Sequence, residues 1–219
     1  MVTRRLATLV AAIAVCIAAA VPASASAQDP ILFVHGYVES ASLWNTMIGN
    51  FEKDGYPKSY LSAYSYNTSQ SNKIDAEEVK SKVETLLKNT GATKVDIIAH
   101  SMGSLNSRYY IKNLGGEAKV DDWVSLGGPN HGTETANFCF SASCVEMRVG
   151  STFLKELNAT DETPGAVNYG TWWSPCDEII NPDSSVALSG ATNTKTACIS
   201  HTALTTDSTV YTQVREFVK

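Results

Sequence analysis

One serine in this chain stands in a pattern that favours nucleophilic catalysis. Ser101 is the centre of Ala99-His100-Ser101-Met102-Gly103, which follows an apolar stretch and precedes a helical pattern. A serine at a sharp turn from strand to helix can project its hydroxyl, and the helix N-terminus stabilises developing negative charge. The usual motif has glycine where Ala99 stands, and alanine keeps that side chain small. Serine is also common at helix N-caps, which is the alternative interpretation of Ser101.

A serine nucleophile needs a base, and in this type of turn the partners follow in the order serine, acid, histidine. His131 and His201 are the two histidines after Ser101. His131 follows Ser101 too closely for an acid-bearing loop to precede it, whereas His201 stands just before a predicted closing helix. We therefore expect His201 to be the base; the alternative is a surface histidine without a catalytic role.

Three carboxylates that could orient the base follow the apolar stretch at residues 167–173, namely Asp177, Glu178 and Asp183. Asp177 is the nearest to the end of the predicted strand, so we expect it to hold the imidazole in place. The same residues with Asn181 form an acidic group, but one catalytic acid and a turn at Asn181-Pro182-Asp183 account for it without a metal ion.

Two backbone N–H groups are needed to stabilise the oxyanion of an acyl-transfer reaction. One belongs to the residue after the nucleophile, here Met102, and the other comes from the loop after an early strand. His35-Gly36-Tyr37 follows the apolar run at residues 31–34, so we expect Tyr37 to supply the second donor. Without the motif at Ser101, His35-Gly36 would be interpreted as an ordinary turn at the end of a strand.

The chain contains five cysteines, of which Cys16 lies in a predicted leader. The other four are Cys139, Cys144, Cys176 and Cys198, an even number that indicates two disulfides with three possible pairings. A metal site is the alternative, but the C-x-x-C spacing of zinc sites is absent from the sequence. We favour Cys176–Cys198, because this bridge would join the loop of the acid to that of the base. Cys139–Cys144 would then close a short loop.

The N-terminal residues predict a secretion signal. Arg4 and Arg5 precede an uncharged run at residues 6–21, and Ala25-Ser26-Ala27 matches a cleavage site. A transmembrane anchor is the alternative, but the run is shorter than the roughly 20 residues that a spanning helix needs. We therefore expect residues 1–27 to be removed and the protein to be extracellular.

Residues 28–219 suit a single domain. Loss of Arg4 and Arg5 leaves 15 of the 17 basic residues against 22 acidic ones, a net charge of about −7. This charge argues against a nucleic-acid partner. No later segment is apolar enough to predict stable membrane insertion, and we expect a monomer.

Short apolar runs alternate with helical patterns, which predicts an α/β fold with a mostly parallel sheet and helices on both faces. The strands are expected at residues 31–34, 60–66, 95–99, 120–126, 167–173 and 195–199. The helices are expected at residues 42–51, 74–87, 102–113 and 209–218. Between residues 130 and 165 no regular pattern is found.

These motifs together resemble small secreted bacterial lipases of the α/β-hydrolase fold, over most of the chain after residue 31. The resemblance is to minimal Bacillus-type lipases, which share the alanine of the turn, and to actinobacterial class 2 lipases. It is carried by Val34-His35-Gly36, by residues 95–103 and 125–132, and by Asp177-Glu178-Ile179-Ile180. It implies an α/β-hydrolase with a minimal lid or none, a triad of Ser101, His201 and Asp177, and no organic cofactor.

The resemblance also implies a secreted lipase or carboxylesterase that hydrolyses triacylglycerols or other esters. Two alternatives stay open: a secreted acyltransferase with the same triad, and a lipid-binding protein that has lost catalysis. The irregular segment is longer than in minimal lipases. Its apolar residues are expected either to form a rim that binds acyl chains or to fill the core, and they are Phe138, Phe140, Met147, Phe153 and Leu154.

Overall fold

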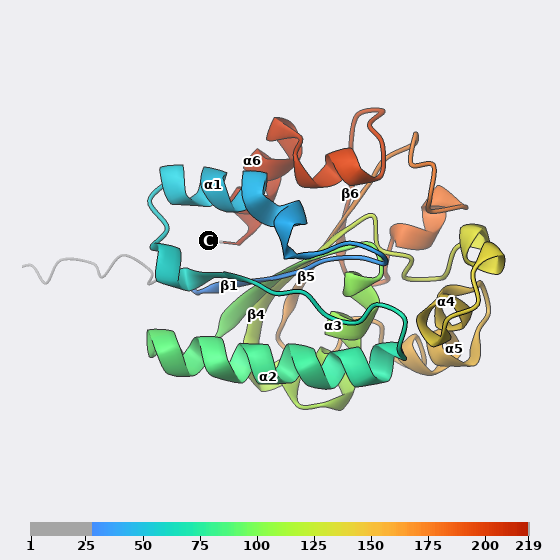
Figure 1. Ribbon diagram of the computed structural model, residues 1–219, viewed down its shortest axis with the longest axis horizontal. Helices are drawn as coiled ribbons and strands as arrows, with labels where there is room; N and C mark the ends of the chain where they lie inside the picture. Colours follow the sequence, from blue (N-terminus) through green and yellow to red (C-terminus); the bar gives the residue numbers. More distant parts are fainter. Residues whose placement is uncertain (1–27, 219) are drawn as a thin grey trace, which may run out of the picture.

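The computed structural model describes residues 28–218, so the predicted signal peptide at residues 1–27 lies outside the described residues. Six strands form one sheet in the order β2-β1-β3-β4-β5-β6, and every neighbouring pair is parallel (Figure 1). The strands are β1 (Ile31–Val34), β2 (Leu61–Ala63), β3 (Val95–His100), β4 (Val120–Leu126), β5 (Asn168–Trp173) and β6 (Thr192–Lys195). The predicted parallel sheet is confirmed.

Strand β1 is apolar along its whole length because both faces of the sheet are covered. In β1, Ile31 and Phe33 belong to the apolar cluster on one face, and Leu32 and Val34 belong to the cluster on the other. All four side chains are fully buried. The first strand is therefore anchored firmly where it leads into the loop at residues 35–39.

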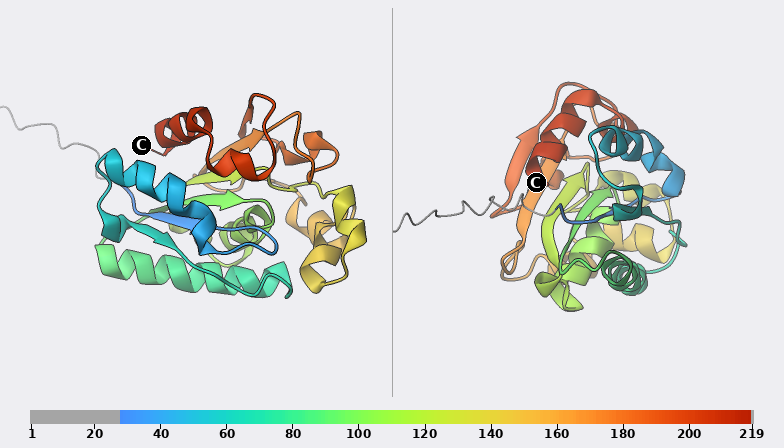
Figure 2. Two further views of the ribbon diagram at one scale, coloured as in Figure 1. Left: turned by 45° about the horizontal axis from the view of Figure 1, so that its top comes forward. Right: turned by 90° about the vertical axis from the view of Figure 1, so that its left-hand side faces the viewer.

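Two helices cover each face of the sheet (Figure 2). The helices α2 (Asn72–Thr90) and α3 (Gly103–Asn113) pack on one face, and α1 (Asn45–Lys53) and α6 (Ser208–Phe217) pack on the other. Two of these helices have recognisable boundary signals: the Ser71 hydroxyl caps the start of α2, Gly91 ends it at a φ of 74°, and Asp207 caps α6. The predicted helices on both faces are confirmed.

The position of the last strand differs from the expectation. The structure places β6 at Thr192–Lys195, whereas residues 195–199 were expected to form it. The strand lies at the edge of the sheet with mostly exposed polar side chains, so it carries no hydrophobic signal. Its Asn193 side chain instead accepts a hydrogen bond from the Thr171 hydroxyl of β5, at 2.7 Å.

The segment without a regular pattern contains two short helices, α4 (Ala142–Met147) and α5 (Thr152–Leu157). Three of its apolar residues fill the core and two are exposed, and the binding of acyl chains stays a prediction. Met147, Phe153 and Leu154 are buried in a third apolar cluster, together with Met102 and Leu105 of the turn and helix after β3. Phe138 and Phe140, in contrast, are 86% and 82% exposed.

Short 3₁₀ helices complete the chain: η1 (Ala41–Trp44), η2 (Lys58–Tyr60), η3 (Gly116–Ala118), η4 (Glu134–Phe138), η5 (Asp183–Val186) and η6 (Thr202–Thr205). Among the helices of residues 28–218, none combines the length and the apolar character that a membrane crossing requires.

The first turn of α2 contains a buried carboxyl group, Asp75. Its Oδ1 accepts a hydrogen bond of 2.7 Å from Gln70 Nε2, and its Oδ2 has no partner in the described chain. Burial raises the pKa of Asp75 to about 7. Between about pH 4 and pH 7 the Asp75 carboxyl therefore stays protonated in the folded protein. In the unfolded chain, where its pKa is about 3.9, it has lost this proton.

We expect Asp75→Asn to increase stability at high pH. Because the folded-state pKa is the higher one, the free energy of unfolding falls as pH rises from about 4 through 7, and the charged form remains a cost above that range. The amide carries no such cost, so the variant should be about 1–3 kcal/mol more stable than the parent at pH 8. Urea unfolding at pH 5 and pH 8 measures this, with the exposed Glu77→Gln as control. A variant less stable than the parent at pH 8 would contradict the interpretation.

Candidate active site

Ser101 lies at the turn that joins β3 to α3, as the motif predicts. Its backbone has a φ of 52°, an unfavourable conformation for a residue with a side chain, and its N–H donates to the Leu126 carbonyl at 3.0 Å. Gly103 lets α3 begin directly against β1: a Cβ there would lie 2.5 Å from Val34 O and 2.6 Å from His35 O. The turn is therefore fixed by its contacts with both neighbouring strands.

The structure brings His201 together with Asp177. His201 Nδ1 lies 2.7 Å from Asp177 Oδ2, and both residues lie on loops beyond the end of β5. Asp177 Oδ1 accepts hydrogen bonds of 2.9 Å from the N–H groups of Ile179 and Ile180. Burial alone would raise the pKa of Asp177, but the hydrogen bonds from His201 and these two amides hold it below its usual value.

The other candidates for acid and base do not meet in this way. Glu178 accepts a hydrogen bond from the backbone N–H of His201 at 3.0 Å and so supports the loop rather than the ring. The His131 ring pairs with Glu162 at 2.7 Å. Asp183 lies in η5 and makes no contact with the His201 ring among the described hydrogen bonds and ion pairs.

Both disulfides form the pairs that the sequence analysis favours, Cys139–Cys144 and Cys176–Cys198. The second joins the loop of Asp177 to that of His201, with the two Cα atoms 4.9 Å apart. The Ser174 hydroxyl reinforces the connection by accepting hydrogen bonds from the N–H groups of Cys176 and Ile199. The relative position of acid and base is thus fixed covalently and by hydrogen bonds.

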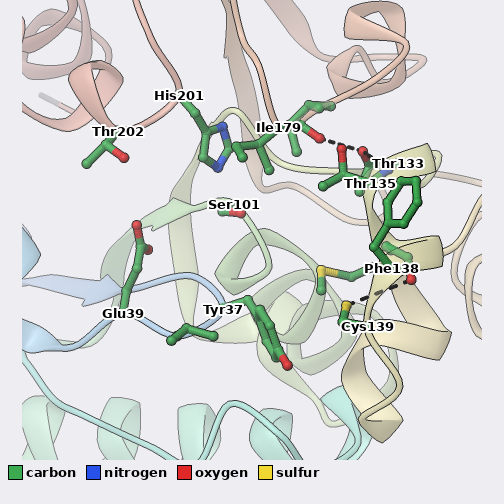
Figure 3. A pocket seen from close by; sticks show the side chains of 14 residues that line it. Tyr37, Glu39, Ser101, Thr133, Thr135, Phe138, Cys139, Ile179, His201 and Thr202 are labelled. Atoms are coloured by element: carbon green, nitrogen blue, oxygen red, sulfur yellow. Dashed lines mark hydrogen bonds between the residues drawn. The ribbon is translucent and has the colours of Figure 1, made fainter.

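Ser101 and His201 line one pocket, with the imidazole beside the serine (Figure 3). No hydrogen bond joins Ser101 Oγ to the ring in this structure, and such bonds often shorten only when substrate is bound. Burial lowers the pKa of His201, although Asp177 opposes this change. The lowered pKa favours the neutral ring, the form that can accept a proton.

The two N–H groups expected to stabilise an oxyanion are available. Those of Tyr37 and Met102 donate no hydrogen bond within the described chain. Gly36 brings the first loop close to the serine, because a Cβ on Gly36 would lie 2.6 Å from Ser101 Cβ and 3.2 Å from its Oγ. Met102 begins the turn into α3 directly after Ser101.

The pocket has a volume of about 430 Å³ and a mostly apolar lining. Figure 3 shows Phe138, the last residue of η4, and the adjacent Cys139 on one side and Tyr37 on another. The apolar lining residues include Val38, Ala136, Phe138, Met147, Ile179 and Ile180. Among residues 28–218 no group of three or more His, Cys, Asp or Glu side chains is placed to hold a metal ion.

The carboxylate of the pocket, Glu39, was not identified from the sequence. Its Oε2 accepts a hydrogen bond of 2.6 Å from Gly36 N–H and lies 2.9 Å from His100 Nδ1. Among the described residues that line the pocket, it is the one carboxylate. One partner, His100, is the last residue of β3 and lies 61 residues further along the chain, so no local sequence pattern indicates this contact.

Comparison with known proteins gives matches at the level of family, sequence and fold. The family model described as Lipase (class 2) matches residues 28–217. The triacylglycerol lipases of Pseudarthrobacter phenanthrenivorans and Burkholderia plantarii are each 26% identical over 120 residues, or 52% of this chain. These matches span 37% and 33% of the two relatives, about a third of their length.

A solved structure shows the same fold over nearly the whole of both chains. The mature form of the Bacillus licheniformis lipase BlEst2 superimposes with a TM-score of 0.79 at 18% identity, covering 91% of this chain and 95% of that one. The fold is thus the α/β-hydrolase fold that the resemblance implies. Since the family model extends over almost the entire described chain, the protein belongs to the Lipase (class 2) family.

Proposed function

We propose that this protein is a secreted lipase or carboxylesterase that cleaves ester bonds through an acyl-enzyme on Ser101. One observation carries the proposal: the strained Ser101 turn opens into an apolar pocket beside His201, whose ring is paired with the buried Asp177 at 2.7 Å. The names of the related triacylglycerol lipases support the same reaction. In this proposal residues 28–219 form one catalytic domain that follows a cleaved signal peptide.

The reaction proceeds in two steps. Ser101 Oγ attacks the ester carbonyl as His201 Nε2 takes the hydroxyl proton, and Asp177 stabilises the imidazolium that forms. The N–H groups of Tyr37 and Met102 donate to the oxyanion. His201 then gives its proton to the departing alcohol, and water repeats the sequence on the acyl-enzyme to release the acid.

The exposed aromatic side chains beside the pocket support a lipid substrate. Phe138 and Phe140 flank Cys139 and are largely exposed, and Val38 stands exposed on another side of the pocket. Exposed apolar groups next to a binding site indicate a surface that contacts an apolar partner. Here we infer that the partner is a lipid–water interface and that the protein acts on it as a monomer. The two disulfides support an extracellular location, because such bonds persist in oxidising compartments.

Hydrolysis of p-nitrophenyl esters of increasing acyl length, alongside emulsified triacylglycerol, tests the proposal directly. The parent protein should cleave both, and Ser101→Ala should lose nearly all activity with an unchanged thermal unfolding transition. Activity on short esters alone would restrict the assignment to a carboxylesterase. An inactive parent would overturn it and favour a lipid-binding protein, and acyl transfer to an added alcohol in place of hydrolysis would identify an acyltransferase.

The pH profile should report the ionisation of His201. Only the neutral ring can accept the serine proton, so kcat/KM should be constant at neutral pH and fall as pH drops through the histidine pKa. Because burial lowers the pKa of His201, we expect the midpoint below 6.5. Rates on a soluble short-chain ester from pH 4 to 9 measure it. A midpoint above 7 would contradict the assignment of a buried neutral base.

A further inference from the structure

The carboxylate of Glu39 lies in the pocket but has no part in the proton transfers proposed above (Figure 3). Its side chain is 20% exposed. One oxygen, Oε2, accepts the Gly36 N–H at 2.6 Å and also contacts His100 Nδ1 at 2.9 Å. Since a carboxylate only accepts hydrogen bonds, Nδ1 of His100 must be the donor.

These two contacts reach both loops that carry the expected oxyanion donors. Gly36 directly precedes Tyr37, and His100 is two residues before Met102. His100 is fully buried, and its Nε2 lies 3.2 Å from the carbonyl oxygen of His201. A single carboxylate–histidine pair therefore contacts the loops of the oxyanion donors, the nucleophile and the base.

The loop that Glu39 holds is strained. Val38 has a φ of 58°, although it is β-branched and 77% exposed. A side chain of this type adopts that conformation only where the surrounding contacts impose it. Loss of the Glu39 contacts would let residues 36–38 relax and turn the Tyr37 N–H away from the pocket.

The backbone of Gly36 also lies very close to Glu39 and to Ser101. A Cβ on Gly36 would lie 2.6 Å from both Glu39 Oε2 and Ser101 Cβ, so the carboxylate and the serine enclose this backbone from two sides. On another side the loop is held by Tyr66, whose hydroxyl donates to the His35 carbonyl and accepts from Asn106 of α3. Glu39 thus completes a set of contacts that fixes the first donor relative to the nucleophile helix.

We propose that Glu39 is a positioning residue of the oxyanion hole, which acts through Gly36 and His100 to aim the N–H groups of Tyr37 and Met102. This inference rests on the proposed ester hydrolysis. The groups that Glu39 aligns act on the oxyanion, which forms only in the transition state, so its loss should lower kcat and leave KM nearly unchanged.

The test compares Glu39→Ala and Glu39→Gln on a soluble short-chain ester. Removal of one oxyanion donor costs about 100- to 1000-fold in kcat, and misalignment costs less. We therefore expect Glu39→Ala to lower kcat by about 10- to 100-fold with KM within about threefold. Glu39→Gln keeps an acceptor oxygen and should retain kcat within about threefold. Glu134→Ala is the matched control. Glu134 is also a hydrogen-bonded carboxylate, accepting from Asn181, but it is not among the residues that line the pocket.

Parallel assays of the parent and Ser101→Ala separate this inference from the proposed function. If the parent is active and Ser101→Ala is not, the ester hydrolase stands whatever the Glu39 variants do. Parental kcat in Glu39→Ala, a change in KM alone, or equal losses in Glu39→Gln and Glu39→Ala would each overturn the positioning role. If Glu39→Ala does not fold, Glu39→Met, which lacks an acceptor but has similar length, must show the same loss of kcat.

Discussion

The backbone turn at Ser101 is the constraint on which the rest of the site depends. A residue with a side chain held at a φ of 52° is stable only if its surroundings fix it. Here the fully buried strand β3 fixes one end, and the close packing of Gly103 against β1 fixes the other. The same packing places the loop after β1 beside Ser101, so one contact positions both the proposed nucleophile and the proposed oxyanion donors.

The proposed acid, Asp177, and the proposed base, His201, approach this turn from the other half of the sheet. Their loops follow β5 and β6 and are joined by Cys176–Cys198, which removes much of the freedom that two long loops would otherwise have. Burial lowers the pKa of His201 and so disfavours its protonated form, whereas the hydrogen bond from His201, together with those from two backbone amides, lowers the pKa of Asp177 and favours its charged form. Both shifts suit the proposed pair of a neutral base and an ionised acid.

The sequence predicts those parts of the molecule that local patterns determine. The apolar strands are seen in the sequence as hydrophobic runs, and the turn around Ser101 as a short motif. The acid and the base are indicated by the order of Asp177 and His201. The strand β6 leaves none, because an exposed edge strand of polar residues has no hydrophobic pattern. The short helices α4 and α5 depend on tertiary packing and a disulfide. Glu39 acts through His100, 61 residues away along the chain, and only the folded structure brings the two together.

Covalent labelling of the nucleophile tests the central claim most directly. A p-nitrophenyl alkylphosphonate should react with the Ser101 hydroxyl, release one p-nitrophenol per chain and leave a phosphonyl group on that oxygen. Peptide mass spectrometry should locate the group on the peptide that contains Ser101, and ester hydrolysis should decline in proportion to the labelled fraction. A label on another residue, or full hydrolysis by protein labelled completely at Ser101, would contradict the assignment of the nucleophile.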